Sequence, residues 1–199
     1  MKTKKNSIAV SIFLVGLMLA ILSGFAVFYM KDLTANLKAE TNAYLSEISQ
    51  QSVKTVKKQI DGDLSTLHDL AEFLGAQEDL DLNRILPTLE GVCENNGFKR
   101  MGIITSDGIA HTTDHMEMDF SDQAYFYDAF INGDPSVTDM LTDKADGEPI
   151  HVYATPIYKQ DKAIAVIFAA HHMDVYQELL SVSTFEGRGY SYIVQNTGE

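Results

Sequence analysis

Six histidines are the residues of this sequence whose chemistry first raises the question of a metal site. His111 and His115 lie four positions apart, a spacing that brings two side chains to one metal ion on a helix. Here they stand at the end of a predicted strand, where four residues span about 13 Å, so they cannot share a metal directly. His171 and His172 are adjacent and point to opposite faces of an extended segment. We expect no metal and no cofactor, and a structural or surface role for the histidines.

Serine, histidine and aspartate all occur, but none of the motifs that arrange them for catalysis is present. The sequence has no Gly-x-Ser-x-Gly, no glycine-rich phosphate loop and no paired cysteine motif. The single cysteine, Cys93, follows Leu89 and Val92 in an apolar-periodic segment, which favours a buried small hydrophobe over a catalytic thiol. We therefore predict no catalytic residue.

Three consecutive aromatic residues, Tyr125, Phe126 and Tyr127, suit binding rather than catalysis. Successive side chains of a helix point about 100° apart, so three neighbours cannot all be buried on one face. At least one of them can face a pocket. Core packing is the alternative for any one of them.

Residues 31–199 are strongly acidic. They carry all 28 Asp and Glu residues and 12 of the 15 Lys and Arg residues, so their formal charge is 12 minus 28, or −16. Nucleic acid and anionic lipid are poor partners for such a surface. Solubility is the simplest explanation of the acidity. We predict no nucleic-acid binding.

The segment Ile8 to Met30 contains 23 consecutive residues without a charge. As a helix it spans about 34 Å, slightly more than a hydrocarbon core of about 30 Å. Three lysines and no acidic residue precede it, which keeps residues 1–7 in the cytoplasm and places the bulk of the chain outside, anchored to the cell membrane by a single pass. A cleaved secretory signal is the alternative, because Gly24-Phe25-Ala26 resembles a weak cleavage site.

A long helix is predicted after the membrane segment, over residues 31–75, which lack proline and are rich in good helix formers. An apolar stripe should pack on the rest of the molecule; it consists of Val53, Val56, Ile60, Leu64, Leu67, Ala71 and Leu74. Asp61, Asp63 and Asp69 are expected on the solvated side. The earlier stripe, Leu33 to Ile48, is interrupted, and Gly16, Ala20 and Gly24 follow one face of the membrane helix, so we expect a homodimer.

Changes of period and turn sequences predict the remaining elements. The helices should cover residues 82–94, residues 121–130 with Ser121 as N-cap, and residues 174–180. The strands should cover residues 100–106 and 109–113, joined by a turn at Asp107-Gly108, and then residues 137–141, 150–158, 163–170 and 189–195. Mostly adjacent, antiparallel strands with flanking helices make an α+β fold.

An ordered set of motifs in this sequence resembles the Cache sensor domains, the extracytoplasmic PAS-like domains of bacterial chemoreceptors, histidine kinases and diguanylate cyclases. The motifs are the anchor and long helix, Gly97-Phe98, Gly102 to Gly108, Phe120 to Phe126, Gly133, Ala154 to Ile157, Ala163 to Ala170 and Gly189 to Val194. The resemblance implies a transmembrane helix (8–30), a stalk helix (31–75) and a membrane-distal PAS-like lobe (76–188) with an antiparallel sheet. Residues 189–199 would begin a second, truncated lobe, so we expect the front part of a longer receptor.

The amino-acid-binding members of this family imply where a ligand would lie. They use an Arg for the ligand carboxylate, two aromatics, a Tyr-x-Asp and a final Asp for the amino group. The matching residues here are Gln123, then Tyr125 and Phe126, then Leu141 and Asp143, and finally Ala170. Because the guanidinium and the last carboxylate are missing, we do not expect an α-amino acid held in the family's usual way.

Our first hypothesis is the ligand-sensing region of a membrane receptor. Its predicted ligand-binding residues are Gln123, Tyr125, Phe126, Asp143, His151 and Tyr153. The ligand would be a small molecule bound by hydrogen bonds and aromatic contact, with a cationic or polar group opposite Asp143. The second hypothesis is a membrane-anchored protein-interaction and oligomerisation module without a small-molecule ligand, and the third is an extracytoplasmic hydrolase.

Overall fold

The computed structural model describes residues 2–176 of the 199-residue chain, and for residues 2–13 and 15 it describes the backbone alone. The chain divides into two compact units, residues 1–51 and residues 52–199, which we call the N-terminal unit and the globular unit. The strand expected at residues 189–195, the second lobe expected from residue 189 and most of the helix expected at residues 174–180 lie outside the described residues.

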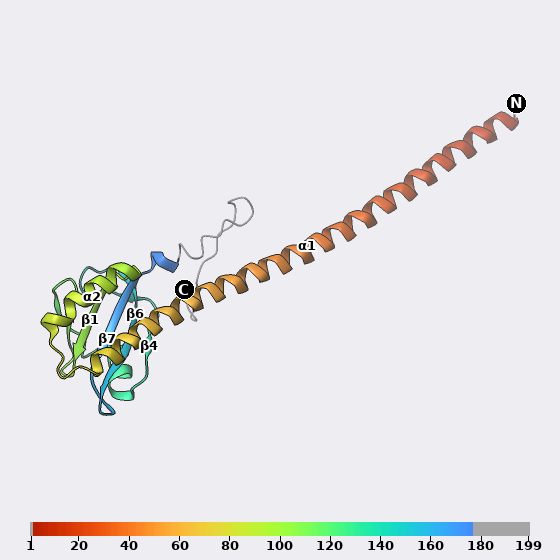
Figure 1. The fold of residues 1–199 in the computed structure, drawn as a ribbon. Helices are drawn as coiled ribbons and strands as arrows, with labels where there is room; N and C mark the ends of the chain where they lie inside the picture. The colour runs from red at the N-terminus through yellow and green to blue at the C-terminus, as the bar shows by residue number, and fades with distance from the viewer. Residues whose placement is uncertain (1, 177–199) are drawn as a thin grey trace. The chain divides into compact units, whose positions relative to one another are not determined.

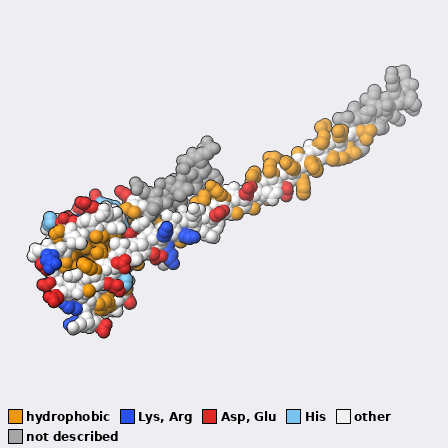
Figure 2. Space-filling model, viewed as in Figure 1, with side chains coloured by type: hydrophobic (Ala, Val, Ile, Leu, Met, Phe, Trp, Pro, Cys, Tyr) orange, Lys and Arg blue, Asp and Glu red, His pale blue; other side chains and the backbone are white. Residues whose placement is uncertain are grey.

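The N-terminal unit is helical over all of its described residues. They form the first part of α1, Lys2–Gly75, whose last 24 residues belong to the globular unit. Part of α1 is long and apolar enough to cross a membrane, by length and composition, and Figure 2 shows hydrophobic side chains gathered toward its N-terminal end. Leu33 and Leu37 are 41% and 53% exposed. The helix predicted over residues 31–75 is confirmed.

The globular unit is an antiparallel sheet with flanking helices (Figure 1). After α1 the elements are α2 (Leu82–Asn96), β1 (Arg100–Thr105), β2 (Ile109–Thr112), β3 (Glu117–Asp119), α3 (Ala124–Tyr127), the π-helical turn η1 (Asp128–Asn132), β4 (Ser136–Val137), β5 (Leu141–Thr142), β6 (Pro149–Lys159) and β7 (Lys162–His172). The strands lie in the order β3-β2-β1-β7-β6-β4, and β5 also pairs with β6. This arrangement confirms the predicted α+β, PAS-like fold.

One face of the sheet is covered by α2 and by the part of α1 in the globular unit. Leu67 and Leu74 of α1 and Leu89 of α2 are buried in one apolar cluster with Ile103 of β1. Ile60 packs against the same cluster, whereas Val53 is 65% exposed. The predicted apolar stripe therefore joins the core from Ile60 onward and not, as expected, from Val53. We call this face the helical face.

Asp63 does not lie on the solvated side of α1 as predicted. It is 4% exposed. Three residues after Ile60 and four before Leu67, it shares the face that the apolar stripe occupies. The helical period therefore buries this carboxylate, and its partner is His171 of β7, at 3.2 Å.

The opposite face of the sheet is covered by α3, η1 and the connections around them, and we call it the loop face. Its apolar cluster contains Ile104 of β1, Val152 of β6 and Phe168 of β7, together with Phe120 and Phe126 from the covering segment. Phe120 meets Phe168 edge to face, with ring centroids 5.6 Å apart. Short elements and connections, rather than long helices, thus close this side of the core.

Two predicted boundaries in the covering segment are wrong. Ser121 is not an N-cap, because its hydroxyl donates to Oδ1 of Asp119 at 2.6 Å, and the helix begins after Gln123, whose backbone is extended (φ −84°, ψ 129°). The predicted strand at residues 137–141 is divided between β4 and β5, which pair with different parts of β6. In both places side-chain hydrogen bonds and tertiary pairing, which local sequence does not reveal, decide the boundary.

The last turn of α1 is in direct contact with the backbone of β6. A Cβ atom added to Gly75 would collide with the carbonyl oxygen of Tyr158. Beyond the helix, Nζ of Lys159 donates to the carbonyl oxygens of Gln77, at 3.1 Å, and Glu78. Glycine at position 75 thus permits a helix-to-strand approach that no other residue would allow.

Candidate functional site

A small cavity of about 20 Å³ lies on the loop face of the sheet. Its floor comes from β1, β6 and β7, and includes Phe168 and Ala170. Its cover comes from two connections, one with Gln123 and Tyr125 at the start of α3, the other with Asp143 after β5. We call this space the polar cavity. Its volume suits roughly one water molecule, so a larger ligand requires the cover to move.

Asp143 is the centre of a buried charge network at the edge of this cavity. It is 3% exposed, and its two carboxylate oxygens lie 2.9 and 2.8 Å from Nη1 of Arg100. Nζ of Lys99 is 3.0 Å from Oδ2 of Asp143, and the backbone N–H of Ala145 donates to Oδ1 at 2.9 Å. Nε of Arg100 also binds Asp114, at 2.6 Å. The carboxylate is therefore satisfied within the protein and is not free to pair with a cationic ligand, contrary to our expectation.

The surroundings of Asp143 keep it ionised. Burial opposes the charge, but the hydrogen bonds from Ala145, Lys99 and Arg100 outweigh it and lower the pKa of the carboxyl below its usual value. The pKa of the Arg100 guanidinium is raised, because the hydrogen bonds to Asp114 and Asp143 outweigh its burial. The network is thus fully charged across the ordinary pH range.

Tyr125 offers the cavity a hydrogen-bond donor that the protein leaves unused. The residue is 4% exposed, and its hydroxyl has no hydrogen-bond partner among the described residues. Burial, and then the negative charges of Asp122 and Asp143, raise the pKa of the phenol, so it stays protonated. A polar ligand in the cavity would accept a hydrogen bond from this hydroxyl.

Lys144 links the two segments that cover the cavity. Its Nζ donates to the carbonyl oxygen of Asp119 at 2.9 Å and to Oδ1 of Asp122 at 2.7 Å. The same nitrogen lies 5.6 Å from the centre of the Phe120 ring, a cation–π contact. Asp119 and Asp122 are exposed, so this connection across the cavity is a weak one that solvent can replace.

The structure brings three of the six predicted ligand-binding residues together, since Gln123, Tyr125 and Asp143 all line the polar cavity. Phe126 lies beside them, but its ring stacks on Phe130 at 5.4 Å and packs into the core of the loop face. The remaining two, His151 and Tyr153, lie elsewhere.

His151 and Tyr153 are placed away from the polar cavity because side chains of a strand alternate between faces. Val152 lines the cavity, whereas Tyr153 joins the apolar cluster of the helical face and its hydroxyl bonds to that of Tyr176. Nδ1 of His151 lies 2.9 Å from the carbonyl oxygen of Thr138, and its ring meets that of Tyr176 edge to face. These two residues thus belong to a different cluster.

Arg100 is the cavity residue that sequence reasoning missed. It lies opposite Ala170 in the pairing of β1 with β7, so the small alanine leaves room for the guanidinium. Its acidic partners are 14 and 43 residues away in the sequence, so no local pattern reveals the network. The available signal was the pair Lys99-Arg100 at the start of a predicted strand in a strongly acidic chain.

Several of the histidines lie beside a carboxylate. His111 lies 3.3 Å from Glu117, and His115 lies 3.5 Å from Glu90. Within residues 2–176 no group of three His, Cys, Asp or Glu side chains is placed to hold a metal ion.

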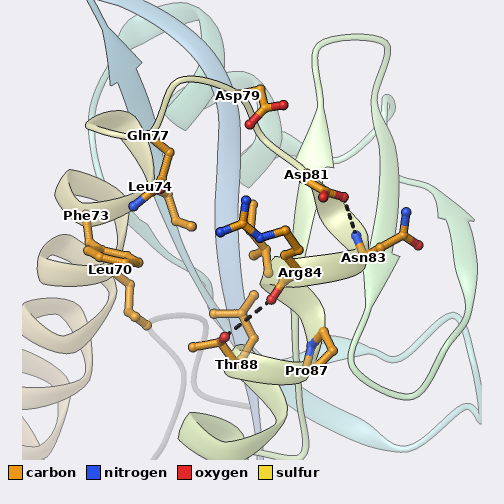
Figure 3. Close-up of a pocket in the computed structure, with 12 residues that line it drawn as sticks. Leu70, Phe73, Leu74, Gln77, Asp79, Asp81, Asn83, Arg84, Pro87 and Thr88 are labelled. Atoms are coloured by element: carbon orange, nitrogen blue, oxygen red, sulfur yellow. Dashed lines mark hydrogen bonds between the residues drawn. The ribbon is translucent and has the colours of Figure 1, made fainter.

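A second, larger cavity of about 390 Å³ lies between the end of α1 and α2, on the helical side of the globular unit (Figure 3). Its apolar wall includes Leu70, Phe73 and Leu74. The figure shows the side chain of Arg84 reaching across the cavity toward α1, and this guanidinium forms no ion pair with a described residue. This larger cavity is the comparison site for ligand experiments.

An antiparallel sheet, covered on one face by long helices and on the other by short elements around a small cavity, is a PAS-like fold. No protein-family model and no curated protein sequence matches the chain. Solved structures do, among them ligand-binding domains of bacterial chemoreceptors.

Three of these structures illustrate the similarity. The domain of the amino-acid chemoreceptor PctC of Pseudomonas aeruginosa PAO1, in complex with GABA, matches with a TM-score of 0.66 and 21% identity over 77% of this chain and 71% of that one. The domain of CtaA of Pseudomonas fluorescens, in complex with L-serine, matches with a TM-score of 0.70 and 16% identity over 81% of this chain and 71% of that one. The domain of Tlp3 of Campylobacter jejuni, in complex with 4-methylisoleucine, matches with a TM-score of 0.61 and 16% identity over 68% of this chain and 60% of that one. The chain therefore has the Cache-type fold that the sequence resemblance implied.

Proposed function

We propose that this chain is the extracytoplasmic ligand-sensing region of a membrane-anchored signal-transduction receptor of the chemoreceptor, histidine kinase or diguanylate cyclase type. The observation that carries the proposal is the polar cavity, with the unpartnered hydroxyl of Tyr125 and the amide of Gln123 in its cover. It lies in a fold shared with domains that bind small amino acids in their solved structures. The chain's own part is then binding, and it carries no catalytic step.

The ligand we propose is a small polar molecule that binds through hydrogen bonds and aromatic contact rather than through a charge clamp. Asp143 and Arg100 neutralise each other, so neither offers a free charge. Gln123 and Tyr125 remain as neutral hydrogen-bonding groups, and Phe120 supplies an aromatic wall. Small zwitterions such as those bound by the similar domains belong in the test panel, but their recognition here would differ.

Ligand screening by thermal shift tests this proposal with a contrast between the two cavities. Full-length chain in detergent micelles is melted with a panel of L-amino acids, GABA, small amides and amines. We expect at least one compound to raise the melting temperature of the wild type and of Arg84→Ala, and to have little effect on Gln123→Ala. Loss of the shift in Arg84→Ala alone would move the site to the larger cavity. No shift with any compound would favour the interaction-module hypothesis.

We further propose a single-pass anchor at residues 8–30 with the N-terminus in the cytoplasm. The support is the uncharged run and the lysines that precede it. A reporter enzyme active only outside the cytoplasm, fused after Glu199, should be active, and a cytoplasm-only reporter should be silent. The opposite pattern would exclude this topology.

A homodimer through the N-terminal unit completes the proposal. Its support is the small-residue face of Gly16, Ala20 and Gly24 and the exposed apolar stripe beyond it. Single cysteines at Leu33, Asn36, Leu37 and Lys38, in a Cys93→Ser background, should crosslink between chains with helical periodicity. Crosslinking that is absent, or uniform around the helix, would contradict a dimeric stalk.

A further inference from the structure

A cavity of about 490 Å³ lies at an open edge of the sheet, and we call it the edge cavity. Past Ala154, β6 has β7 on one side and no described strand on the other, because β4 pairs only with Tyr153 and Ala154. One wall of the cavity comes from this free part of β6, another from α1, and a third from the turn before β4. None of its lining residues lines the polar cavity, so the two spaces are separate.

Thr155 of β6 brings a hydroxyl without a partner to the edge cavity. The residue lines the cavity and is 2% exposed, and its Oγ1 is buried with no hydrogen bond to a described residue. The hydroxyl of Thr112, which is equally buried, instead bonds to Asp114 and to the carbonyl oxygen of Met116. A buried polar group without a partner destabilises a fold unless a molecule from outside the chain supplies one. In the wall of a cavity that molecule can be a ligand.

The mouth of the edge cavity carries a carboxylate. Nε2 of His68 lies 3.4 Å from Oε1 of Glu72, one turn further along α1, and the two side chains are 62% and 72% exposed. Among the described lining residues Glu72 is the only acidic one, and none is Lys or Arg. Ala71, Pro135 and Pro156 supply apolar surface. This lining favours a cation with an apolar body over an anion.

A hydrogen bond holds one wall of the edge cavity in place. The hydroxyl of Tyr158 donates to the carbonyl oxygen of Gly133 at 3.0 Å, which connects β6 to the turn before β4. Gly133 has a φ of 80°, and a Cβ atom there would collide with the same hydroxyl, so the contact requires glycine. The hydroxyl of Tyr158 is therefore already engaged, and that of Thr155 remains for a ligand.

We propose that the edge cavity is a second ligand site, for a small molecule with an apolar body, a hydrogen-bonding group that reaches Thr155 and a positively charged end beside Glu72. Burial sets this orientation, because Thr155 is enclosed whereas Glu72 is exposed, so the charge of the ligand stays hydrated. Since α1 and β6 both line the cavity, the ligand would bridge the helix and the sheet edge and stabilise their contact. The site does not depend on a ligand in the polar cavity.

Tyramine is a probe with these three features, and two analogues test them singly. Phenethylamine lacks the hydroxyl, and 4-hydroxyphenylacetate carries a carboxylate in place of the ammonium group. Calorimetric titration into the full chain in micelles, with micelles alone as the blank, measures the affinities. We expect tyramine to bind about fivefold more tightly than phenethylamine, and 4-hydroxyphenylacetate to bind most weakly. No binding of tyramine, or equal binding of the three compounds, would overturn the proposal.

Thr155→Val should change stability and binding in different directions. It removes the unpartnered hydroxyl and keeps the shape of the side chain, so the free protein should melt at or above the temperature of the wild type. Tyramine and phenethylamine should bind this variant equally. Thr112→Val, which removes a bonded hydroxyl, is the control and should melt lower. A Thr155→Val variant that melts as low as Thr112→Val would show that the hydroxyl has a partner within the protein, and would contradict the proposal.

Variants of the charged groups test the orientation of the probe. Glu72→Gln should weaken tyramine binding about threefold, a modest loss because this carboxylate is exposed. Asp69→Asn removes another exposed carboxylate of α1, one that does not line the cavity, and should bind as the wild type does. Equal affinities in the two variants would overturn the place assigned to Glu72.

The edge cavity and the polar cavity can fail separately as ligand sites. Tyramine binding that is unchanged in Thr155→Val and lost in Gln123→Ala would place the compound in the polar cavity, which would overturn this proposal and support the proposed function. A screen that finds no ligand for the polar cavity would leave a positive tyramine result standing.

Discussion

The two faces of the sheet are closed in different ways. On the helical face, α1 and α2 bury a cluster of aliphatic side chains in which Leu67, Leu89 and Met101 are almost fully enclosed. On the loop face, short elements enclose aromatic rings, a small cavity and the charge network of Asp143 and Arg100. Dispersion and water exclusion hold the first face, whereas the second depends on a few directional contacts. The difference separates the face that supplies most of the stability from the face on which we propose the ligand site.

Removing a core side chain from the helical face should have the largest effect. Leu89 is 1% exposed, so Leu89→Ala leaves a cavity and should lower the free energy of unfolding by about 4 kcal/mol. Ligand affinity of the folded protein should be unchanged. Chemical denaturation measures the first quantity and calorimetry the second. Thr88→Ala, on the exposed side of α2, is the control. An equal loss of unfolding free energy in this variant would show that burial in the helical-face core does not explain the effect.

Breaking the charge network tests the loop face and should come second. Asp143→Ala leaves Arg100 without one of its two carboxylate partners and should cost about 3 kcal/mol. The matched control is Asp146→Ala, because Asp146 is an exposed partner of Lys99. Denaturant midpoints measure both. Comparable losses in the two variants would mean that burial adds nothing to the network.

The same network predicts an acid-sensitive loop face. The pKa of Asp143 is lowered in the folded protein, so its contribution to stability is fully present above the unfolded value of about 3.9 and is lost as the pH falls through the folded pKa. The unfolding free energy of Asp143→Asn should therefore be lower than that of the wild type at pH 6, and the gap should narrow as the pH falls below the unfolded value. A gap that stays constant down to pH 2 would show that lost packing, not lost charge, explains the variant.

Removing one hydroxyl from the polar cavity should sharpen the contrast without unfolding the protein. Tyr125→Phe deletes the unpartnered donor, so it should weaken ligand binding by about 1 kcal/mol, or roughly fivefold, and leave the melting temperature nearly unchanged. Tyr127→Phe changes an exposed phenol on the same helix and should bind normally. Titration calorimetry with the compound found by screening measures the affinity of both variants. Unaltered binding in Tyr125→Phe would remove this hydroxyl from the site.

The smallest effect on stability is expected at Lys144. Its contacts to Asp119 and Asp122 are exposed, so Lys144→Ala should cost less than about 1 kcal/mol. Because Lys144 connects the two covering segments, its loss should instead speed ligand association. Stopped-flow binding measures this rate, and Lys162→Ala in the β6–β7 hairpin is the control. An unchanged association rate would show that Lys144 does not hold the cover closed.

Sequence reasoning succeeded on the helical face and stopped short on the loop face, for one physical reason. Residues that recur every three or four positions, such as Leu64, Leu67 and Ala71, record the buried side of a helix in the sequence itself. The contacts of Arg100 do not, because they join residues far apart in the chain. Alternation along β6 puts Tyr153 and Val152 on opposite faces, but only the pairing of the strands tells which face holds the cavity, so Tyr153 was wrongly placed in the site. Asp63 was misplaced for a different reason. It lies at a buried position of the helical period, but because it is charged we expected it in solvent.

The glycine contact at the end of α1 has a mechanical consequence for the globular unit. At Gly75 the helix backbone rests on the carbonyl of Tyr158, and the amine of Lys159 holds the chain just beyond it, so this point acts as a fulcrum. Asp63 lies twelve residues earlier, about 18 Å along the helix, and a tilt of about 5° about the fulcrum would displace it by roughly 1.5 Å. The close contact that Gly75 allows at one end of the helix thus converts a slight rotation into a shift large enough to separate Asp63 from His171.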